Sequence, residues 1–264
     1  MVWLGIGAHL GTTVENNDDG DFCCEVTEKP GEEGRGFASN VELGFHNDTF
    51  LDTIGMLSVA RAAEGGTSYF SSILAAYDDL ADHQDVEPLF TGWPLYVDAT
   101  KVKVYTEHYH VGGGYETRPI GGGAHVTADP VPVLSWAGEG TGEGLLARWL
   151  PGGVERAAAE LANAEYDDRG KAGTNASFGE DGGLSADHQE LLKAFSKRLY
   201  KNRIELTFQP GEAVLWNNRR IVHARSAFTD GLAEEGKKRL LLRMWIADRD
   251  GDPHAVNPRP QARM

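Results

Sequence analysis

A histidine and an aspartate stand two residues apart in His46-Asn47-Asp48, directly after the apolar run 41–45. In an extended chain, residues two apart point to the same face. One imidazole and one carboxylate placed in this way can grip the same metal ion. The spacing therefore indicates half of a metal site, which needs a further ligand from elsewhere in the fold.

His223 is the best-placed candidate for that further ligand. It ends the short apolar stretch Ile221-Val222, which we predict to be a strand. Two histidines and one carboxylate leave three coordination positions open, as a non-haem Fe(II) oxygenase needs for a bidentate co-substrate and dioxygen. The alternative is that these histidines are buried side chains with ordinary hydrogen-bond partners.

Two other pairs of a histidine and an acid two residues apart do not fit a metal site. His188 and Glu190 fall in a predicted helix, where residues two apart point about 200° away from each other. His83 and Asp85 lie in an acidic run before a proline, with no strand around them. We interpret both pairs as surface residues.

Arg239 and Arg243 point to the same side of a predicted strand, while Leu240 and Leu242 face the other way. A guanidinium is a rigid fork suited to a carboxylate. If His223 holds iron, Arg239 is placed to bind the distal carboxylate of a dicarboxylic co-substrate. Otherwise the two arginines form an ordinary solvent-facing surface.

Short apolar segments separated by glycine-rich turns dominate the elements that must position these residues. We predict strands at 41–45, 55–60, 95–105, 131–136, 204–208, 213–216, 221–223 and 240–246. We predict helices at 69–80, 154–165 and 186–200, the last with Ser185 as its N-cap. Because most strands follow one another without a helix between them, we expect a mainly β fold with peripheral helices, such as a jelly roll.

Length and charge narrow the functional classes. A chain of 264 residues with 41% hydrophobic content supports one substantial core, so we expect a single domain over 1–264. A net charge of -15 disfavours nucleic acids and anionic membranes as partners. No segment resembles a membrane span or a signal peptide, and the two cysteines are adjacent, so we expect a cytoplasmic protein without disulfides.

Basic residues are nevertheless concentrated near the C-terminus, which suggests an anion-binding region. Between 219 and 249 there are eight basic residues, Arg219, Arg220, Arg225, Lys237, Lys238, Arg239, Arg243 and Arg249, against four acids, Asp230, Glu234, Glu235 and Asp248.

Several motifs, taken in their order along the chain, resemble the TauD/TfdA family of Fe(II)- and 2-oxoglutarate-dependent oxygenases, which includes the clavaminate synthase group. The matching segments are Gly44 to Asp48, Gly65 to Ser68, Pro210 to Glu212, Asn217 to Arg225 and Arg239 to Trp245. The resemblance covers about 41–248. It implies a double-stranded β-helix, which is a jelly roll. It also implies the hydroxylation of an unactivated C–H bond of a small molecule, such as an amino acid or a carboxylate, with release of succinate and CO2.

The resemblance also implies roles for individual residues. His46, Asp48 and His223 would bind Fe(II), and Arg239 would pair with the distal carboxylate of 2-oxoglutarate, the co-substrate used with dioxygen. Ser68 stands where relatives place a hydroxyl that touches the same carboxylate, and Thr67 is the adjacent alternative. Arg243 matches a second arginine that meets the substrate in some relatives. Apart from the resemblance, Trp136 is the other candidate substrate contact.

The sequence departs from the family pattern in two places. Only 45 residues precede His46, where relatives carry a longer stretch, so an outer helix or an early strand is expected to be missing. The region 112–183, where relatives build a lid and a substrate pocket, is rich in glycine and matches poorly, so we expect a lid or insertion there and no guide to the substrate.

Two rival functions remain open. A jelly-roll module that binds carbohydrate would use Trp93, Trp136 or Tyr115 as stacking platforms and would need no metal. A cupin-like metalloenzyme would use the metal site without 2-oxoglutarate, and its turnover would not depend on Arg239.

Overall fold

The structure is a computed structural model. It describes residues 2–16, 20–29, 38–48, 52–93, 96–98, 117–121, 124–127, 131–136, 144–155, 157, 184–231 and 238–247. The contacts between residues divide the chain into two compact units, the first made of 1–72 and 202–251 and the second of 73–201 and 252–264. The expected lid at 112–183 falls largely outside the described residues, and the single-domain expectation stays a prediction.

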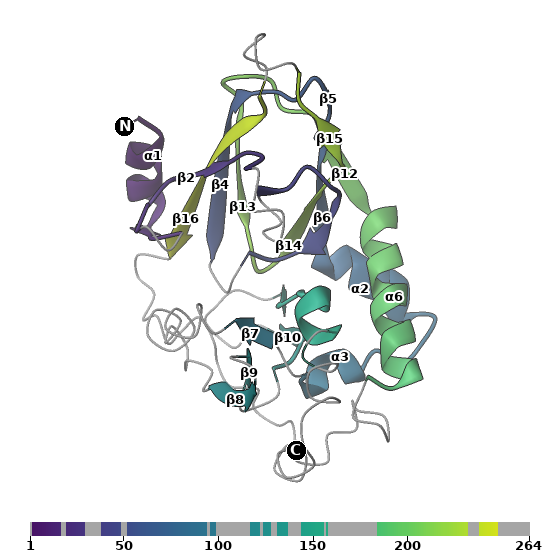
Figure 1. Ribbon diagram of the computed structural model, residues 1–264. Helices are drawn as coiled ribbons and strands as arrows, with labels where there is room; N and C mark the ends of the chain where they lie inside the picture. Colours follow the sequence, from purple (N-terminus) through teal and green to yellow (C-terminus); the bar gives the residue numbers. More distant parts are fainter. Residues whose placement is uncertain are drawn as a thin grey trace. The chain divides into compact units, whose positions relative to one another are not determined.

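The first unit contains two antiparallel sheets (Figure 1). One has the order β1 (Thr12–Val14), β16 (Leu240–Ala247), β4 (Thr53–Ala60) and β13 (Ala213–Asn217), with β2 (Cys24–Val26) also paired to β16. The other has the order β12 (Arg203–Leu206), β6 (Ser68–Ser72), β14 (Ile221–Arg225) and β3 (Leu43–His46). A small pair, β5 (Glu64–Gly65) and β15 (Phe228–Thr229), completes the unit. The expected mainly β fold is confirmed.

Alternation along β16 separates its two faces. Met244 and Ile246 pack with Trp3 of α1 (Val2–Leu10), which lies beside this strand in Figure 1. Arg243 and Trp245 point to the opposite side, as the period of two requires. One face of β16 is thus apolar and is covered by α1. The other face, with Arg243 and Trp245, points to the interior of the jelly roll.

The second unit carries most of the helices. Its elements are α2 (Ile73–Ala81), α3 (Pro88–Thr91), β7 (Tyr96–Asp98), β8 (Thr117–Gly121), β9 (Ala124–Thr127), β10 (Leu134–Trp136), β11 (Leu145–Ala147) and α6 (Ala186–Lys201). The Ser185 hydroxyl accepts a hydrogen bond from the backbone N–H of His188, which confirms the predicted N-cap of α6. None of the described helices is long and apolar enough to span a bilayer.

Two predicted elements differ from the structure. The helix predicted at 69–80 begins only at Ile73, because Ser68–Ser72 forms β6 and pairs on both sides with β12 and β14. The strand predicted at 204–208 ends at Leu206, and Ile204 is 60% exposed on β12, which is the edge strand of its sheet. The predicted helix at 154–165 lies mostly outside the described residues.

Candidate metal centre

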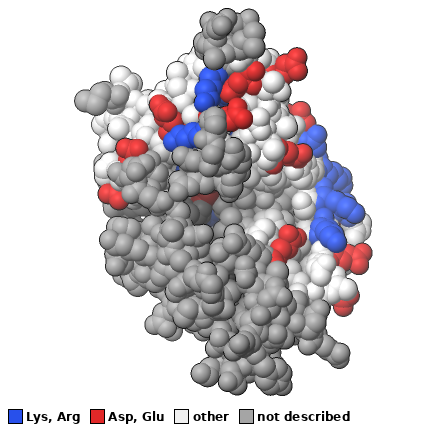
Figure 2. Space-filling model, in the orientation of Figure 1, with Lys and Arg blue, Asp and Glu red and all other residues white. Residues whose placement is uncertain are grey.

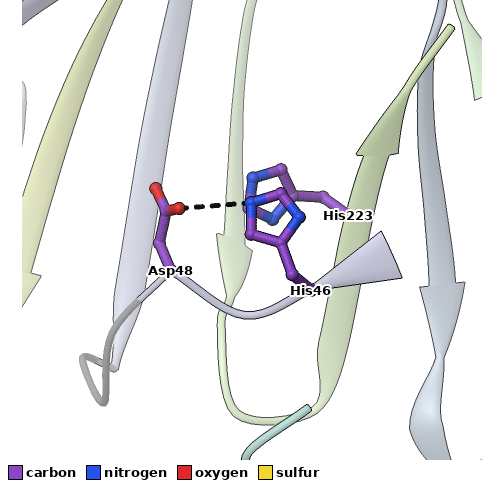
Figure 3. Close-up of side chains that lie close together, drawn as sticks. All are labelled: His46, Asp48 and His223. Carbon is purple, nitrogen blue, oxygen red and sulfur yellow. Dashed lines mark ion pairs between the residues drawn. The ribbon is translucent and has the colours of Figure 1, made fainter. Parts of the chain in front are cut away.

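The pairing of β3 with β14 brings the two predicted histidine ligands together. His46 and His223 are register partners, and the centroids of their rings are 4.3 Å apart. Asp48 follows two residues after His46, and its Oδ1 lies 3.4 Å from Nε2 of His46. Ligand atoms of all three residues lie within 4.8 Å of one another (Figure 3). Among the described residues, this is the one group of three or more such side chains close enough to share an ion.

The backbone fixes the tautomer of His46. Its Nδ1 lies 2.8 Å from the carbonyl oxygen of Gly44, and because a carbonyl oxygen can only accept, Nδ1 must donate. In the neutral ring, Nε2 then carries a lone pair that faces Oδ1 of Asp48. Two acceptors that face each other at this distance repel unless a cation lies between them. The hydrogen bond from Nδ1 to Gly44 is of the kind that orients a histidine towards a metal ion.

Two donors hold the other oxygen of Asp48. Nη1 of Arg243 lies 2.6 Å from Oδ2, and Nε1 of Trp245 donates to the same atom at 3.2 Å. Burial alone would raise the pKa of Asp48, but the charge of Arg243 holds it well below its ordinary value. Asp48 is therefore an anion with Oδ2 engaged and Oδ1 directed towards His46.

His223 is kept neutral by its surroundings. It is 7% exposed, and burial, followed by the neighbouring His46, lowers its pKa to about 3. Its ring lies 5.0 Å from that of Trp216 on β13, and its Nδ1 has no hydrogen-bond partner among the described residues. A neutral imidazole with a free nitrogen is the form that binds a metal.

Asn218, which sequence reasoning did not assign, ties the Asp48 backbone to the β13–β14 turn. Its Nδ2 donates to the Asp48 carbonyl at 2.6 Å, and its Oδ1 accepts from the Asp48 N–H at 3.3 Å. Asn47 returns a hydrogen bond from Nδ2 to the carbonyl of Asn218. Asn47 and Asn218 are both 1% exposed, so these hydrogen bonds are shielded from solvent. The aspartate and the strand that carries His223 are thus held in one network.

A cavity of about 240 Å³ opens beside the three residues. Its lining combines the apolar side chains of Val26, Leu43, Met56, Phe70 and Ala224 with the polar ones of His46, Asp48, Ser68, His223, Arg225, Arg239 and Arg243. A larger groove, of about 570 Å³, lies along α6 in the second unit, but exposed lysine, glutamine and glutamate side chains line it. We place the candidate site in the smaller cavity because His46, Asp48 and His223 line it.

Positive charge is concentrated in this cavity. Arg225, Arg239 and Arg243 are each 5–6% exposed, so the basic side chains that Figure 2 shows along one side of the surface are other residues. Asp48 is the one carboxylate among the described lining residues, and it is paired with Arg243. The cavity therefore has the charge to accept an anion, as the basic residues near the C-terminus suggested.

Arg239 reaches the cavity through a gap that glycine provides. Gly66 has φ +72°, and a Cβ at this position would lie 3.1 Å from Nε of Arg239. Nη1 of Arg239 is buried and has no hydrogen-bond partner among the described residues. Burial, followed by the charge of Arg225, lowers the pKa of Arg239 to about 10, so the group remains a cation at neutral pH.

The two hydroxyl candidates lie in different surroundings. Ser68 is 6% exposed and lines the cavity. The hydroxyl of Thr67 lies 3.2 Å from that of Thr207, outside the cavity lining. The geometry therefore favours Ser68, and the role of either hydroxyl stays a prediction.

The tryptophans proposed as platforms belong to the second unit. Trp136 is 48% exposed and stacks on Phe90 at a centroid distance of 6.2 Å. Trp93 is fully buried, with its Nε1 donating to the carbonyl of Pro88 at 2.6 Å, so it presents no face to a sugar. Tyr115 lies outside the described residues, and a substrate contact by Trp136 stays a prediction.

The donor set fits an iron(II) ion. Two neutral imidazole nitrogens and one carboxylate oxygen suit a non-haem Fe(II) site with open positions. Ligand atoms bound at about 2.0–2.2 Å to one ion lie roughly 3–4 Å apart, close to the separation of His46 Nε2 and Asp48 Oδ1. An anion bound to such an ion would lie in the same cavity as Arg239.

Comparison with known families supports this reading. Residues 161–245 match the family described as Taurine catabolism dioxygenase TauD, TfdA family, which confirms the predicted resemblance. The matched segment includes His223, Arg239 and Arg243 but begins beyond His46 and Asp48. A segment of 74 residues is 39% identical to the L-lysine 3-hydroxylase of Catenulispora acidiphila, covering 28% of this chain and 20% of that protein.

Solved structures show the same fold. The asparagine oxygenase in complex with Fe(II), 2S,3S-3-hydroxyasparagine and succinate superposes with a TM-score of 0.62 at 17% identity, over 94% of this chain and 64% of that one. The non-heme iron oxygenase OrfP in complex with Fe and alpha-ketoglutaric acid gives 0.55 at 15% identity, over 93% of this chain and 63% of that one. The expected double-stranded β-helix is confirmed, and the chain spans slightly less than two thirds of these proteins and about a fifth of the lysine hydroxylase.

Proposed function

We propose that this chain, whose residues 161–245 match the TauD/TfdA family, is an Fe(II)- and 2-oxoglutarate-dependent oxygenase that hydroxylates a small molecule. One observation carries the proposal. The His46, Asp48 and His223 side chains share a cavity with Arg239, a buried guanidinium whose Nη1 has no partner among the described residues. A metal-binding group and an unsatisfied cation in one cavity suit a co-substrate that chelates at one end and carries a carboxylate at the other.

Each residue has a definite task in this proposal. His46 Nε2, Asp48 Oδ1 and one nitrogen of His223 hold the iron. Arg239 binds the distal carboxylate of 2-oxoglutarate, with Ser68 as the hydroxyl donor beside it. Iron supplies the redox chemistry, in which 2-oxoglutarate, dioxygen and a substrate C–H bond give succinate, CO2 and the corresponding alcohol.

The remaining side chains of the cavity control the environment of the reaction. Arg243 and Trp245 keep Asp48 anionic and its Oδ2 engaged, so that one oxygen faces the metal position. Met56 and Phe70 form an apolar wall beside it, which limits access of water to the reacting groups. The protein thus contributes position, charge and exclusion of water.

An amino acid is the substrate class that we propose. The solved oxygenases of the same fold are described with hydroxylated asparagine and hydroxylated arginine, and the matching segment of the curated relative belongs to a lysine hydroxylase. Arg243 and Trp136 remain the proposed substrate contacts, although Arg243 already pairs with Asp48 in this structure. The net charge of -15 argues against nucleic acid or an anionic membrane as a partner.

A cytoplasmic location accords with this activity. Cys23 and Cys24 are free thiols, the state that cytosolic proteins maintain. Cys24 is buried against Arg243, whose Nη2 lies 3.6 Å from its sulfur.

Succinate release in the presence of candidate amino acids tests the proposed function. The purified protein is incubated with Fe(II), 2-oxoglutarate and oxygen, and a substrate should raise succinate formation well above the uncoupled rate. Loss of metal binding without loss of sugar binding in His46→Ala would favour the carbohydrate module instead. Turnover that is unchanged in Arg239→Gln would favour a metalloenzyme that does not use 2-oxoglutarate.

A further inference from the structure

Arg225 occupies the interior of the jelly roll at a position fixed by strand register. It follows His223 by two residues on β14, so both side chains lie on the same face of the strand. On the neighbouring strand β6, Phe70 is the register partner of His223 and Ser68 is the partner of Arg225. The sheet therefore presents two rows of side chains to the cavity, about 6.6 Å apart at 3.3 Å per residue.

The first row contains the metal-binding histidines, and the second contains Arg225 opposite Ser68. The spacing of the rows is comparable with the length of a five-carbon diacid. A molecule whose chelating end lies at the first row would bring its far carboxylate to the second. Ser68, the hydroxyl proposed for that carboxylate, lies directly across from Arg225.

Arg225, on β14, and Arg239, directly before β16, both lie against the ring of Phe228, and the charge of Arg225 acts on Arg239. Their guanidinium carbons lie 4.9 Å and 5.2 Å from the centre of the Phe228 ring. Neither arginine forms an ion pair with a carboxylate among the described residues, whereas Arg243 has Asp48. Two buried like charges repel each other, and an anion between them removes that cost.

The guanidinium of Arg225 is also held in place. Its Nη2 donates to the carbonyl oxygens of Ser39, at 2.7 Å, and Val41. Its Nε is buried without a hydrogen-bond partner among the described residues. Arg225 is thus anchored by one nitrogen while another donor remains unused.

We propose that Arg225 is a second guanidinium for the distal carboxylate of the co-substrate, acting together with Arg239 and Ser68. This inference rests on the proposed function, because it takes 2-oxoglutarate as the occupant of the cavity. Two cations around one carboxylate make the site selective for dicarboxylic 2-oxo acids over monocarboxylic ones. The competing role is purely structural, in which Arg225 only fastens the segment before β3 through Ser39 and Val41.

Binding measurements without turnover distinguish the two roles. The full chain is loaded with Mn(II), and the affinities for 2-oxoglutarate and for 2-oxobutyrate, which shares the chelating end but lacks the distal carboxylate, are measured by calorimetry. In Arg225→Gln we expect 2-oxoglutarate to bind about tenfold or more weakly, the loss of a charge-assisted hydrogen bond, while the affinity for 2-oxobutyrate changes less than about twofold. Arg239→Gln should show the same selective loss, and Arg198→Gln, at a partly exposed position in the second unit, should show none.

An equal loss for both acids, or no loss for either, would overturn the role of Arg225. If Arg225→Gln does not fold, the same two affinities are measured for Arg225→Lys. Lysine keeps the charge but cannot donate to the two carbonyls and to a carboxylate at the same time. A selective weakening of 2-oxoglutarate supports the proposal in this variant also, and an unchanged ratio contradicts it. Failure of the proposed function looks different, because the unmodified protein would then bind neither 2-oxo acid.

Discussion

Arg243 donates to Oδ2 of Asp48 at 2.6 Å, while Oδ1 of the same carboxylate faces Nε2 of His46. The pair is buried, with 7% and 10% of the two side chains exposed. A buried carboxylate that loses its cation is left with an uncompensated charge. The ion pair therefore stabilises the fold and orients the carboxylate that we propose as a metal ligand.

Arg243→Met should destabilise the metal-free protein by roughly 3–5 kcal/mol, because it removes one partner of a buried ion pair. Arg198→Met is a matched control, since Arg198 pairs with Asp79 at 3.7 Å at a partly exposed position and should cost no more than about 1 kcal/mol. Urea unfolding measures both. Equal stability of the two variants would contradict the role of Arg243.

Asn218→Asp should weaken metal binding with a smaller effect on folding. The new carboxylate cannot donate to the Asp48 carbonyl as Nδ2 does, and it repels that oxygen instead. We expect the affinity for Co(II), followed by its visible absorption, to fall about tenfold or more, as for other groups that orient metal ligands. Asn217→Asp is the control, because Oδ1 of Asn217 only accepts hydrogen bonds from Arg219 and Arg220. Equal affinities in the two variants would rule out the positioning role.

The metal-free protein should lose stability as the pH falls from about 6.5 towards 3. Above this range His223 is neutral in both the folded and the unfolded chain, so its titration contributes nothing. Within this range His223 becomes protonated in the unfolded chain but stays neutral in the folded protein, because burial lowers the pKa of folded His223 to about 3. The depressed pKa of Asp48 acts at the acidic end, where its contribution is lost as that carboxylate is protonated.

Unfolding curves between pH 7.5 and 4.5 measure this effect. Removal of the imidazole in His223→Phe should flatten the dependence by on the order of 1 kcal/mol per pH unit, and the exposed His83→Asn should leave it unchanged. A dependence that is as steep in His223→Phe as in the unmodified protein would show that other groups cause it.

Gly66→Ala should weaken binding of 2-oxoglutarate through Arg239. The added Cβ would lie 3.1 Å from Nε of Arg239, so that side chain must shift. Gly211→Ala is the control. Gly211 has φ +89°, so alanine there costs a similar amount of backbone strain, about 1–2 kcal/mol, but the added Cβ has no atom within 4 Å. Calorimetry on the Mn(II)-loaded variants should therefore show weaker binding for Gly66→Ala alone. Equal affinities would mean that the position of Arg239 tolerates the methyl group.

The sequence allowed prediction of which residues gather around the cavity better than of how they are arranged there. Alternation predicted that His46 shares a face with Asp48 and that Arg239 shares one with Arg243, and all four side chains line one cavity. The strands predicted to carry His46 and His223 are present, whereas Arg239 directly precedes β16. The pairing of His46 with His223 could not be predicted, because strand register depends on contacts between segments about 180 residues apart. For the same reason the start of β6 was mistaken for helix, since its residues are held by strands on both sides rather than by their own propensity.

Two of the residues that sequence reasoning missed, Asn218 and Trp245, act by holding Asp48. Asn218 binds backbone atoms of Asp48, and Trp245 binds a carboxylate oxygen, so neither leaves a recognisable spacing. Arg225 did carry a signal, since an arginine two residues after His223 in a predicted strand must share its face. Trp93 shows the opposite error, because a buried structural role and an exposed platform are indistinguishable from residue type alone.

Anaerobic titration of the protein with Fe(II) and 2-oxoglutarate tests the central claim most directly, through the weak visible charge-transfer band of the chelate. The account predicts a band that saturates at one iron per chain and is absent in His46→Ala, Asp48→Ala and His223→Ala variants that remain folded. The absence of a band in the unmodified protein, or its persistence in all three variants, would contradict the assignment of the metal to these residues.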